Sequence, residues 1–322
     1  MAPGADTGEG VGPPAGRGGG RRVGPDGGEV GAVADDEAVQ DDQVVPDDGA
    51  VPDDGVEVLT GGGVNTVVRV GATVRRPTGP WSVRVHDLLR HLERAGLSGV
   101  PRFHGTTPEG LEVLDFLPGE VSGYPVTAAA GTHEALVSAA RLLREYHDAT
   151  AAFAAGAPRE GWMMPARDPV EVLCHNDYAP HNCVLQGDRV VGLIDFDTAG
   201  PGPRTWDVAY AAYRWVPLSD PAAGGVRGTA EEQPVRLREF CDAYGLDAAG
   251  RRELVDVVVA RLHALVAFVR AEAAAGNAAF AGHLADGHHL LYLGDAGYVA
   301  GRRAEFERAL LSTPGPDGPP TG

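Results

Sequence analysis

The sequence predicts an α+β protein of two lobes, a small β-rich lobe over residues 55–118 and a larger, mainly helical lobe over residues 119–313. Short runs of β-branched residues separated by glycine and proline fill the first segment, which is typical of strands and turns. Apolar residues recur at helical spacing through most of the second. Residues 172–197 interrupt that helical pattern with a stretch rich in His, Asp and Asn, where we expect the functional site.

The first lobe is expected to hold five strands and one helix. Its Val- and Thr-rich runs are bounded by Gly-Gly-Gly, Gly-Ala and Pro breaks. Residues 81–95 instead place Val85, Leu88 and Leu92 on one face of a helix. A Pro-Gly pair at 118–119 ends the lobe. The predicted strands are residues 56–59, 66–70, 73–76, 100–105 and 111–117.

The second lobe is expected to be built from helices. Leu136, Ala140 and Leu143 recur at helical spacing within residues 132–150. A small β-rich lobe before a helical one suggests a site between them. The further predicted helices are residues 204–213, 235–244, 251–275 and 290–311.

Both ends of the chain are predicted to be disordered. Residues 1–54 are rich in Gly, Pro and Asp with few large apolar groups, so they cannot bury enough surface to offset the entropy of ordering. Residues 314–322 have the same character. The net charge is -18, and 13 acids against 3 Arg in residues 1–54 contribute -10 of it. A chain that is acidic throughout argues against a nucleic-acid partner.

Composition also predicts a cytoplasmic protein that does not enter the membrane. No run of 18 apolar residues is present, and the first residues lack the basic and then apolar order of a secretory signal. Three cysteines are few and odd in number, which fits a reducing compartment. Cys174 and Cys183 flank the polar stretch, but their spacing is not that of a zinc site.

The polar stretch contains two clusters of hydrogen-bonding side chains. The first is His175, Asp177 and Asn182, and the second is Asp195 and Asp197. Carboxylate and amide oxygens are hard ligands that suit Mg²⁺. The alternative is a purely structural role, in which these Asp and Asn residues only form turns at the edge of a polar hairpin.

A hairpin would bring the two clusters together. Gly187-Asp188 is a turn signal between two short β-rich runs, residues 183–185 and 190–194. Folding at this turn returns the second cluster to the end of the hairpin where the first one lies. The carboxylates then need a compensating cation.

The spacing of these residues resembles a known family. His175-x-Asp177-x4-Asn182, followed after twelve residues by Asp195-Phe196-Asp197, is similar to the catalytic and metal loops of the aminoglycoside phosphotransferase and choline kinase family, within the protein-kinase-like superfamily. The resemblance covers residues 55–215 well and the later helices only in a general way. Other matching segments are the Gly-rich turn at 60–65, the lobe linker at 114–119, the helix at 142–147 and Trp206-Asp207.

The resemblance implies an enzyme that uses ATP and Mg²⁺. Asp177 would orient the acceptor hydroxyl and take its proton, because phosphoryl transfer relies on positioning and charge neutralisation. Asn182 and Asp195 would hold Mg²⁺, and Asp197 would assist a second metal ion or only hold the loop. His175 is expected to brace the catalytic loop, with a titrating role as the less favoured reading.

Asp207 is expected to be structural, bonding the backbone of the catalytic loop from the start of a helix. The four acids Glu231, Glu232, Glu239 and Asp242 lie where the family builds its acceptor site. They would either meet an amine-bearing acceptor or form a solvated helix face.

In the first lobe, the resemblance assigns nucleotide contacts to loop and strand residues. The backbone of Gly61, Gly62 and Gly63 would cover the phosphates, and backbone groups near Asp115 and Leu117 would pair with adenine.

The family's phosphate-binding lysine has no counterpart, because the chain contains no Lys and its 27 basic residues are all Arg. Arg75 or Arg76 must take its place, and the alternation of strand faces allows only one of them to point inward. Arg75 is the slight preference. The helix glutamate that pairs with the lysine is also not evident in residues 81–92.

These expectations describe a small-molecule O-phosphotransferase with a hydroxyl acceptor, for which an aminoglycoside or another amine-bearing molecule is the candidate. Two alternatives stay open. One is a nucleotide-binding regulatory pseudokinase, which the missing lysine and helix glutamate would suit. The other is nucleotidyl transfer on the same fold, which would release pyrophosphate rather than ADP.

Overall fold

A computed structural model of the chain describes residues 55–59, 67–123, 125–223 and 228–312. All of them belong to one compact unit, Ala38–Gly322. The disorder predicted for residues 1–54 and 314–322 concerns residues outside the described ranges. Gly61, Gly62 and Gly63, for which a phosphate-binding role is predicted, also lie outside the described ranges.

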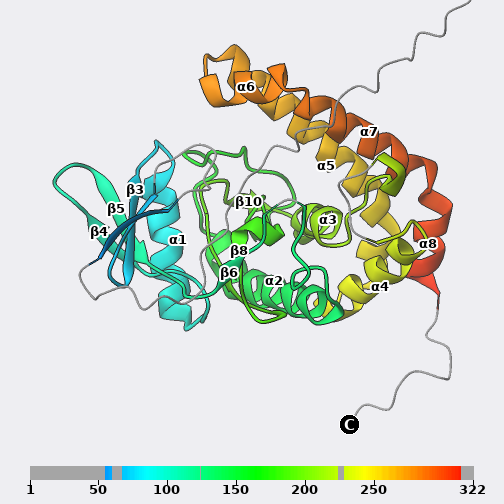
Figure 1. Ribbon diagram of the computed structural model, residues 1–322, viewed down its shortest axis with the longest axis horizontal. Coiled ribbons are helices and arrows are strands. Elements are labelled where there is room, and N and C mark those ends of the chain that lie inside the picture. The colour runs from blue at the N-terminus through cyan, green and yellow to red at the C-terminus, as the bar shows by residue number, and fades with distance from the viewer. Residues whose placement is uncertain (1–54, 60–66, 124, 224–227, 313–322) are drawn as a thin grey trace, which may run out of the picture. The chain divides into compact units, whose positions relative to one another are not determined.

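The first lobe is an antiparallel sheet of five strands in the order β1-β2-β3-β5-β4, covered by the helix α1, Ser82–Ala95 (Figure 1). The face of α1 that the sequence marks as apolar is the face that is buried, with Val85, Leu88 and Leu92 almost inaccessible. The predicted strands are confirmed in number and place. Their bounds are Val56–Leu59 for β1, Val67–Val70 for β2, Thr73–Pro77 for β3, Phe103–Thr106 for β4 and Leu111–Asp115 for β5.

The second lobe is mainly helical, as predicted, and α5 packs against α3, α6, α7 and α8 (Figure 1). The prediction of one last helix over residues 290–311 is wrong. The backbone leaves helical geometry at Arg302, whose φ is -103°, so two helices meet there. The helices are α2 His133–Ala154, α3 Arg204–Trp215, α4 Glu232–Tyr244, α5 Ala248–Ala274, α6 Ala278–Ala285, α7 His288–Gly301 and α8 Arg303–Leu311.

The polar stretch forms the predicted hairpin. Its strands are β8, Cys183–Gln186, and β9, Arg189–Leu193, and Gly187 makes the turn with a φ of 63°. Cys183 pairs with Leu193 across the hairpin, so its open end brings the two polar clusters together. Three short strands were not expected: β6, Glu120–Val121, which pairs with β8, and β7, Val172–Cys174, which pairs with β10, Gly200–Gly202.

Two glycines let the chain pass close to this hairpin where it enters and leaves the sheet of the first lobe. The Gly99 carbonyl accepts a hydrogen bond of 2.7 Å from the Leu193 amide. A Cβ at Gly99 would lie 2.3 Å from the Val191 carbonyl oxygen, and one at Gly119 would lie 2.4 Å from that of Leu185. Both glycines also have positive φ, which a side chain would strain. The hairpin is therefore in close backbone contact with the segment before β4 and with the segment after β5.

The main core lies under the hairpin, where α2 packs against β7 and β9. Leu136, Leu143 and Tyr146 of α2 are fully buried there. The three cysteines are buried and free of disulfides. Among the described helices, none is both long enough and apolar enough to cross a membrane. The predicted lobe boundary at residues 118 and 119 stays a prediction.

Candidate active site

The loop predicted to be catalytic, residues 175–182, follows β7 and is held by Asp207 near the start of α3. The Asp207 carboxylate accepts hydrogen bonds from the backbone amides of His175, at 2.6 Å, and Asn176, at 2.8 Å. It also accepts one of 3.0 Å from Nε2 of His147. Burial opposes ionisation, but these hydrogen bonds and the nearby histidines hold the pKa of Asp207 below its usual range. The structural role predicted for Asp207 is confirmed.

Asn176 takes a left-handed backbone conformation directly before Asp177. Its φ is 64°, which is uncommon for any residue except glycine and is best tolerated by Asn and Asp. Besides the amide bonded to Asp207, its side chain donates to the Thr198 carbonyl at 3.0 Å. Its own carbonyl accepts a bond of 2.6 Å from Arg261 of α5. The strained conformation is thus fixed from three directions.

Asp177 and Asn182 bind each other across the loop. The Asn182 amide nitrogen donates to the Asp177 backbone oxygen at 2.9 Å and to its carboxylate at 2.8 Å. Because that nitrogen is engaged with Asp177, the side-chain oxygen of Asn182 is the atom left to bind a cation.

The Asp177 carboxylate is partly open, with 31% of its side chain exposed and Nε2 of His181 at 3.4 Å. Desolvation would raise its pKa. The charge and hydrogen bond of His181, with smaller contributions from His175 and Tyr210, outweigh it and hold the pKa of Asp177 well below its usual range.

The loop that carries Asp195 and Asp197, called the metal-type loop below, is joined to the loop of Asp177 and Asn182 by hydrogen bonds. The Ile194 amide donates to the Asn182 carbonyl at 2.9 Å, and Nε2 of His175 donates to the Ile194 carbonyl at 3.0 Å. This second bond is the bracing contact expected of His175. Asp195 follows with a φ of 61° and presents a side chain that is 47% exposed. Asp177, Asn182 and Asp195 are therefore held as one unit.

Arg76, rather than Arg75, points toward these aspartates. Its guanidinium donates to Asp195 at 2.9 Å and to Asp197 at 2.6 Å, so it links β3 to the metal-type loop. These carboxylates, together with Glu112, raise the pKa of Arg76 further despite its burial. Arg75 lies on the opposite face of β3 and is exposed. The preference for Arg75 is wrong, because strand alternation alone cannot say which face of an isolated strand is buried.

Sequence reasoning missed two residues that hold Arg76. Glu112 on β5 is 1% exposed and accepts a hydrogen bond of 2.5 Å from Nε of Arg76. His86 of α1 donates to the other oxygen of Glu112 at 2.6 Å, while its ring stacks on Phe103 at 3.7 Å. The carboxylate sought on the helix is thus supplied by a neighbouring strand. A signal was present, since Glu112 stands between the apolar residues Leu111 and Val113 within a predicted strand.

The balance of charge here suits one more cation. Three carboxylates surround the single guanidinium of Arg76. Burial raises the pKa of Asp197 to about 6, against the opposing effect of Arg76 and with Asp195 and Glu112 adding to it. Among the described residues, no group of three or more His, Cys, Asp or Glu could hold a metal ion alone. Mg²⁺ binds through one or two carboxylates together with substrate phosphates, so Asn182 and Asp195 fit it.

The adenine contacts expected near Asp115 and Leu117 stay predictions, and one backbone group at Asp115 is already paired. The Asp115 amide donates to the Arg102 carbonyl at 3.1 Å, so it is not available to pair with a base. Its carboxylate accepts from the Arg102 amide at 3.1 Å and from Nε2 of His104 at 2.6 Å. Leu117 is half-buried, and its role stays a prediction.

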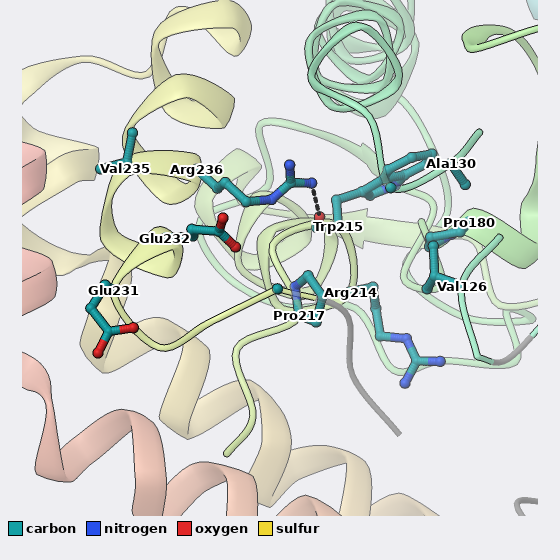
Figure 2. A pocket seen from close by; sticks show the side chains of 12 residues that line it. Val126, Ala130, Pro180, Arg214, Trp215, Pro217, Glu231, Glu232, Val235 and Arg236 are labelled. Carbon is teal, nitrogen blue, oxygen red and sulfur yellow. Dashed lines mark hydrogen bonds between the residues drawn. The ribbon is translucent and has the colours of Figure 1, made fainter. Parts of the chain in front are cut away.

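A cavity of about 420 Å³ lies between the end of α3, the start of α4 and the catalytic loop (Figure 2). Arg236 of α4 points toward Trp215 and donates to its carbonyl oxygen at 3.3 Å. Glu232 accepts a bond of 2.9 Å from the Thr229 amide. The lining residues are Val126, Ala130, Gly131, Pro180, Arg214, Trp215, Pro217, Gly228, Glu231, Glu232, Val235 and Arg236.

Residues 152–254 match a family model described as the phosphotransferase enzyme family, APH. The chain is 35% identical over 211 residues to a trifolitoxin immunity protein of Rhizobium leguminosarum bv. trifolii, covering 62% of this chain and 78% of that protein. It is 30% identical over 268 residues to an uncharacterised protein of Deinococcus radiodurans, covering 70% of this chain and 68% of that one.

Two solved structures are similar in fold. A choline/ethanolamine kinase family protein from Mesorhizobium loti has a TM-score of 0.50 at 18% identity, covering 80% of this chain and 91% of that one. The amicoumacin kinase hAmiN has a TM-score of 0.53 at 16% identity, covering 73% of this chain and 89% of that one. At such identities the likeness bears on the fold, and it confirms the predicted two-lobed α+β class.

Proposed function

This chain belongs to the phosphotransferase enzyme family with a protein-kinase-like fold, and from that premise we propose that it transfers the γ-phosphoryl group of ATP to a hydroxyl of a small molecule in the cytoplasm. One observation carries the proposal. Asp177, Asn182 and Asp195 form a single backbone-tied unit, and Arg76 reaches it from the sheet of the first lobe. This set supplies the proton acceptor, the metal ligands and the fixed positive charge that the reaction needs.

Asp177 receives the proton of the acceptor. With its pKa held low, it is a weak base, so it orients the hydroxyl as a hydrogen-bond acceptor and takes the proton only as the new bond forms. The hydroxyl oxygen bonds to the γ-phosphorus while the bond from that phosphorus to the β–γ bridging oxygen breaks. ADP leaves, and the proton passes from Asp177 to solvent.

Asn182 and Asp195 are the proposed ligands of Mg²⁺, which when bound neutralises charge on the phosphate oxygens. Arg76 replaces the missing lysine as the cation that grips the nucleotide phosphates. Its planar fork is permanently charged, and Glu112 together with His86 fixes its orientation. Asp197 holds Arg76 at 2.6 Å, and it either stays in that role or also assists a second metal ion.

The cavity in Figure 2 is the proposed acceptor pocket. Its volume of about 420 Å³ suits a small molecule, and Pro180 lies three residues after Asp177. Glu231 and Glu232 would meet an amino group. Half-buried Arg236 forms no ion pair within 4.0 Å among the described residues, and burial lowers its pKa. The pocket therefore favours a hydroxyl compound that carries both an amine and an anionic group.

Nucleotide binding is expected to stabilise the protein, and Asp195 is expected to be required. Saturating Mg²⁺ and ATP at about 100 times Kd should add about 2.7 kcal/mol to the free energy of unfolding. This corresponds to a Tm roughly 5–10 °C higher. Asp195→Ala should remove most of the shift, because it deletes the charged metal ligand.

The matched control is Asp188→Ala, an exposed aspartate in the turn at the other end of the same hairpin, which should keep the full shift. If the Tm of the unmutated protein does not change when nucleotide and metal are added, the proposal that it is a kinase is contradicted. Release of pyrophosphate in place of ADP would support nucleotidyl transfer, and binding without any transfer would support a pseudokinase.

Acceptor selectivity is expected to depend on Arg236. In ADP-release assays with aminoglycosides, choline-like alcohols, amino alcohols and hydroxyl-bearing amino acids, Arg236→Gln should raise KM for the zwitterionic acceptors about 10- to 100-fold, since a hydrogen bond to a charged group is lost. The KM values of purely cationic acceptors should change little. Arg238→Gln, on the same helix but paired with Asp242, is the control. Equal changes for both acceptor classes would argue against an anion contact.

A further inference from the structure

Arg261 of α5 is buried directly beneath the catalytic loop. It is 1% exposed, and its guanidinium donates a hydrogen bond of 2.6 Å to the carbonyl of Asn176, 85 residues earlier in the chain. Its other two nitrogens, Nε and Nη1, are buried without a hydrogen-bond partner in the described part of the chain. Asp207 and Asp177 favour its charge through electrostatic attraction, but these carboxylates contact His147 and His181, and none of the ion pairs among the described residues includes Arg261.

Such a placement is unfavourable for folding alone. A guanidinium that is removed from water without a directly bonded carboxylate carries a large desolvation penalty. Part of it is offset by aromatic faces, since the guanidinium carbon lies 4.7 Å from the ring centre of Tyr210 and 5.4 Å from that of Trp206. A Met or Leu at this position would avoid the penalty but would leave the Asn176 carbonyl without its donor, so the bond to the loop is what distinguishes Arg from an apolar residue here.

The contacts of Arg261 lead to Asp177 by two routes. Through the Asn176 carbonyl, Arg261 fixes the orientation of the peptide group that joins Asn176 to Asp177, at a residue whose φ is 64°. Through its contact with the aromatic ring, it supports Tyr210, whose side chain lies close enough to Asp177 to help lower the pKa of that carboxyl. Asp207 holds the amide side of Asn176 but does not hold its carbonyl.

We propose that Arg261 is a positioning residue for phosphoryl transfer, which sets the Asp177 carboxylate in the geometry needed to receive the acceptor proton. The inference rests on the proposed function. A displacement of about 1 Å at a reacting group is enough to slow a reaction about 100-fold. The effect of Arg261 should therefore fall on kcat and leave nucleotide binding intact.

The test uses the full chain, with ADP release from Mg–ATP in water as the turnover assay and fluorescence titration with Mg–ATP for Kd. Arg261→Met keeps an aliphatic side chain of similar length and removes the guanidinium group. It should lower kcat about 100-fold while Kd for Mg–ATP stays within about twofold. Arg261→Lys, which keeps the charge but cannot reproduce the fork, should recover only part of kcat.

A double-mutant comparison separates positioning from simple loss of structure. If Arg261 and Tyr210 both act through Asp177, the double variant Arg261→Met with Tyr210→Phe should lose less activity than the product of the two single losses. A purely structural role would instead lower Tm and leave kcat per folded molecule unchanged. If Arg261→Met does not fold, Arg261→Lys alone decides: a lower kcat at unchanged Kd supports the proposal, and an unchanged kcat overturns it.

The outcomes also separate this inference from the proposed function. If the unmutated protein neither binds Mg–ATP nor releases ADP, both are overturned. If it does both and folded Arg261→Met has the same kcat, only the positioning role is overturned.

Discussion

Asp177→Asn is expected to reduce phosphoryl transfer about 1,000-fold while Kd for Mg–ATP stays within about twofold. The substitution keeps the shape of the side chain and an oxygen that can accept from the Asn182 amide, so the loop should keep its conformation. What it removes is the carboxylate that we propose receives the hydroxyl proton. It also removes the negative charge that His181 faces at 3.4 Å.

ADP release with the best acceptor measures transfer, and titration with Mg–ATP measures binding. Asp188→Asn is the control, because it makes the same chemical change at an exposed turn position. A rate for Asp177→Asn equal to that of the unmutated enzyme would rule out Asp177 as the proton acceptor. Loss of nucleotide binding together with transfer would indicate a folding role instead.

Arg76→Met and Arg75→Met are expected to differ widely, although the residues are adjacent. Removing Arg76 leaves Glu112 buried without its arginine partner, and breaking such a buried pair lowers the free energy of unfolding by about 3–5 kcal/mol. Nucleotide affinity should fall as well, because the phosphates lose their fixed cation. Arg75 is exposed, so its replacement should change stability by about 0.5 kcal/mol at most.

Urea unfolding of both variants, with and without Mg–ATP, measures the two effects. Combining Arg76→Met with Glu112→Gln should recover part of the lost stability, since the uncompensated carboxylate is then neutral. Similar stabilities for Arg75→Met and Arg76→Met would contradict the proposed division of roles between the two arginines.

The parts of the site that sequence could predict are those set by local chain geometry. Twelve residues separate Asn182 from Asp195, and they form a hairpin whose turn is marked by Gly187, so the proximity of the two residues follows from the turn. The strands of the first lobe and the core face of α1 follow likewise from residue type and spacing. The residues that hold these side chains in place, such as Glu112 and Arg261, do not follow from such patterns.

The missed features depend on pairing between distant segments. Arg76 meets Glu112 because β3 pairs with β5, residues that are 36 positions apart, and no local pattern selects that partner over β4. That pairing also decides that Arg76, and not Arg75, faces inward. β7 and β10 are three residues each, too short for alternation to mark them. In the sequence, Arg261 is one polar residue in a long helix, and nothing in the local pattern predicts its contact with Asn176.

The close backbone approach at Gly99 and Gly119 has a consequence for how this protein tolerates mutation. Neither residue carries a functional group, yet any side chain would collide with a main-chain oxygen of the hairpin, and a main-chain atom cannot rotate away as a side chain can. Substitution there would act at the catalytic unit through displacement of β8 or β9. A complete substitution map of the chain should therefore show two isolated positions of near-total intolerance in segments that otherwise accept change, as sensitive as the charged residues of the site.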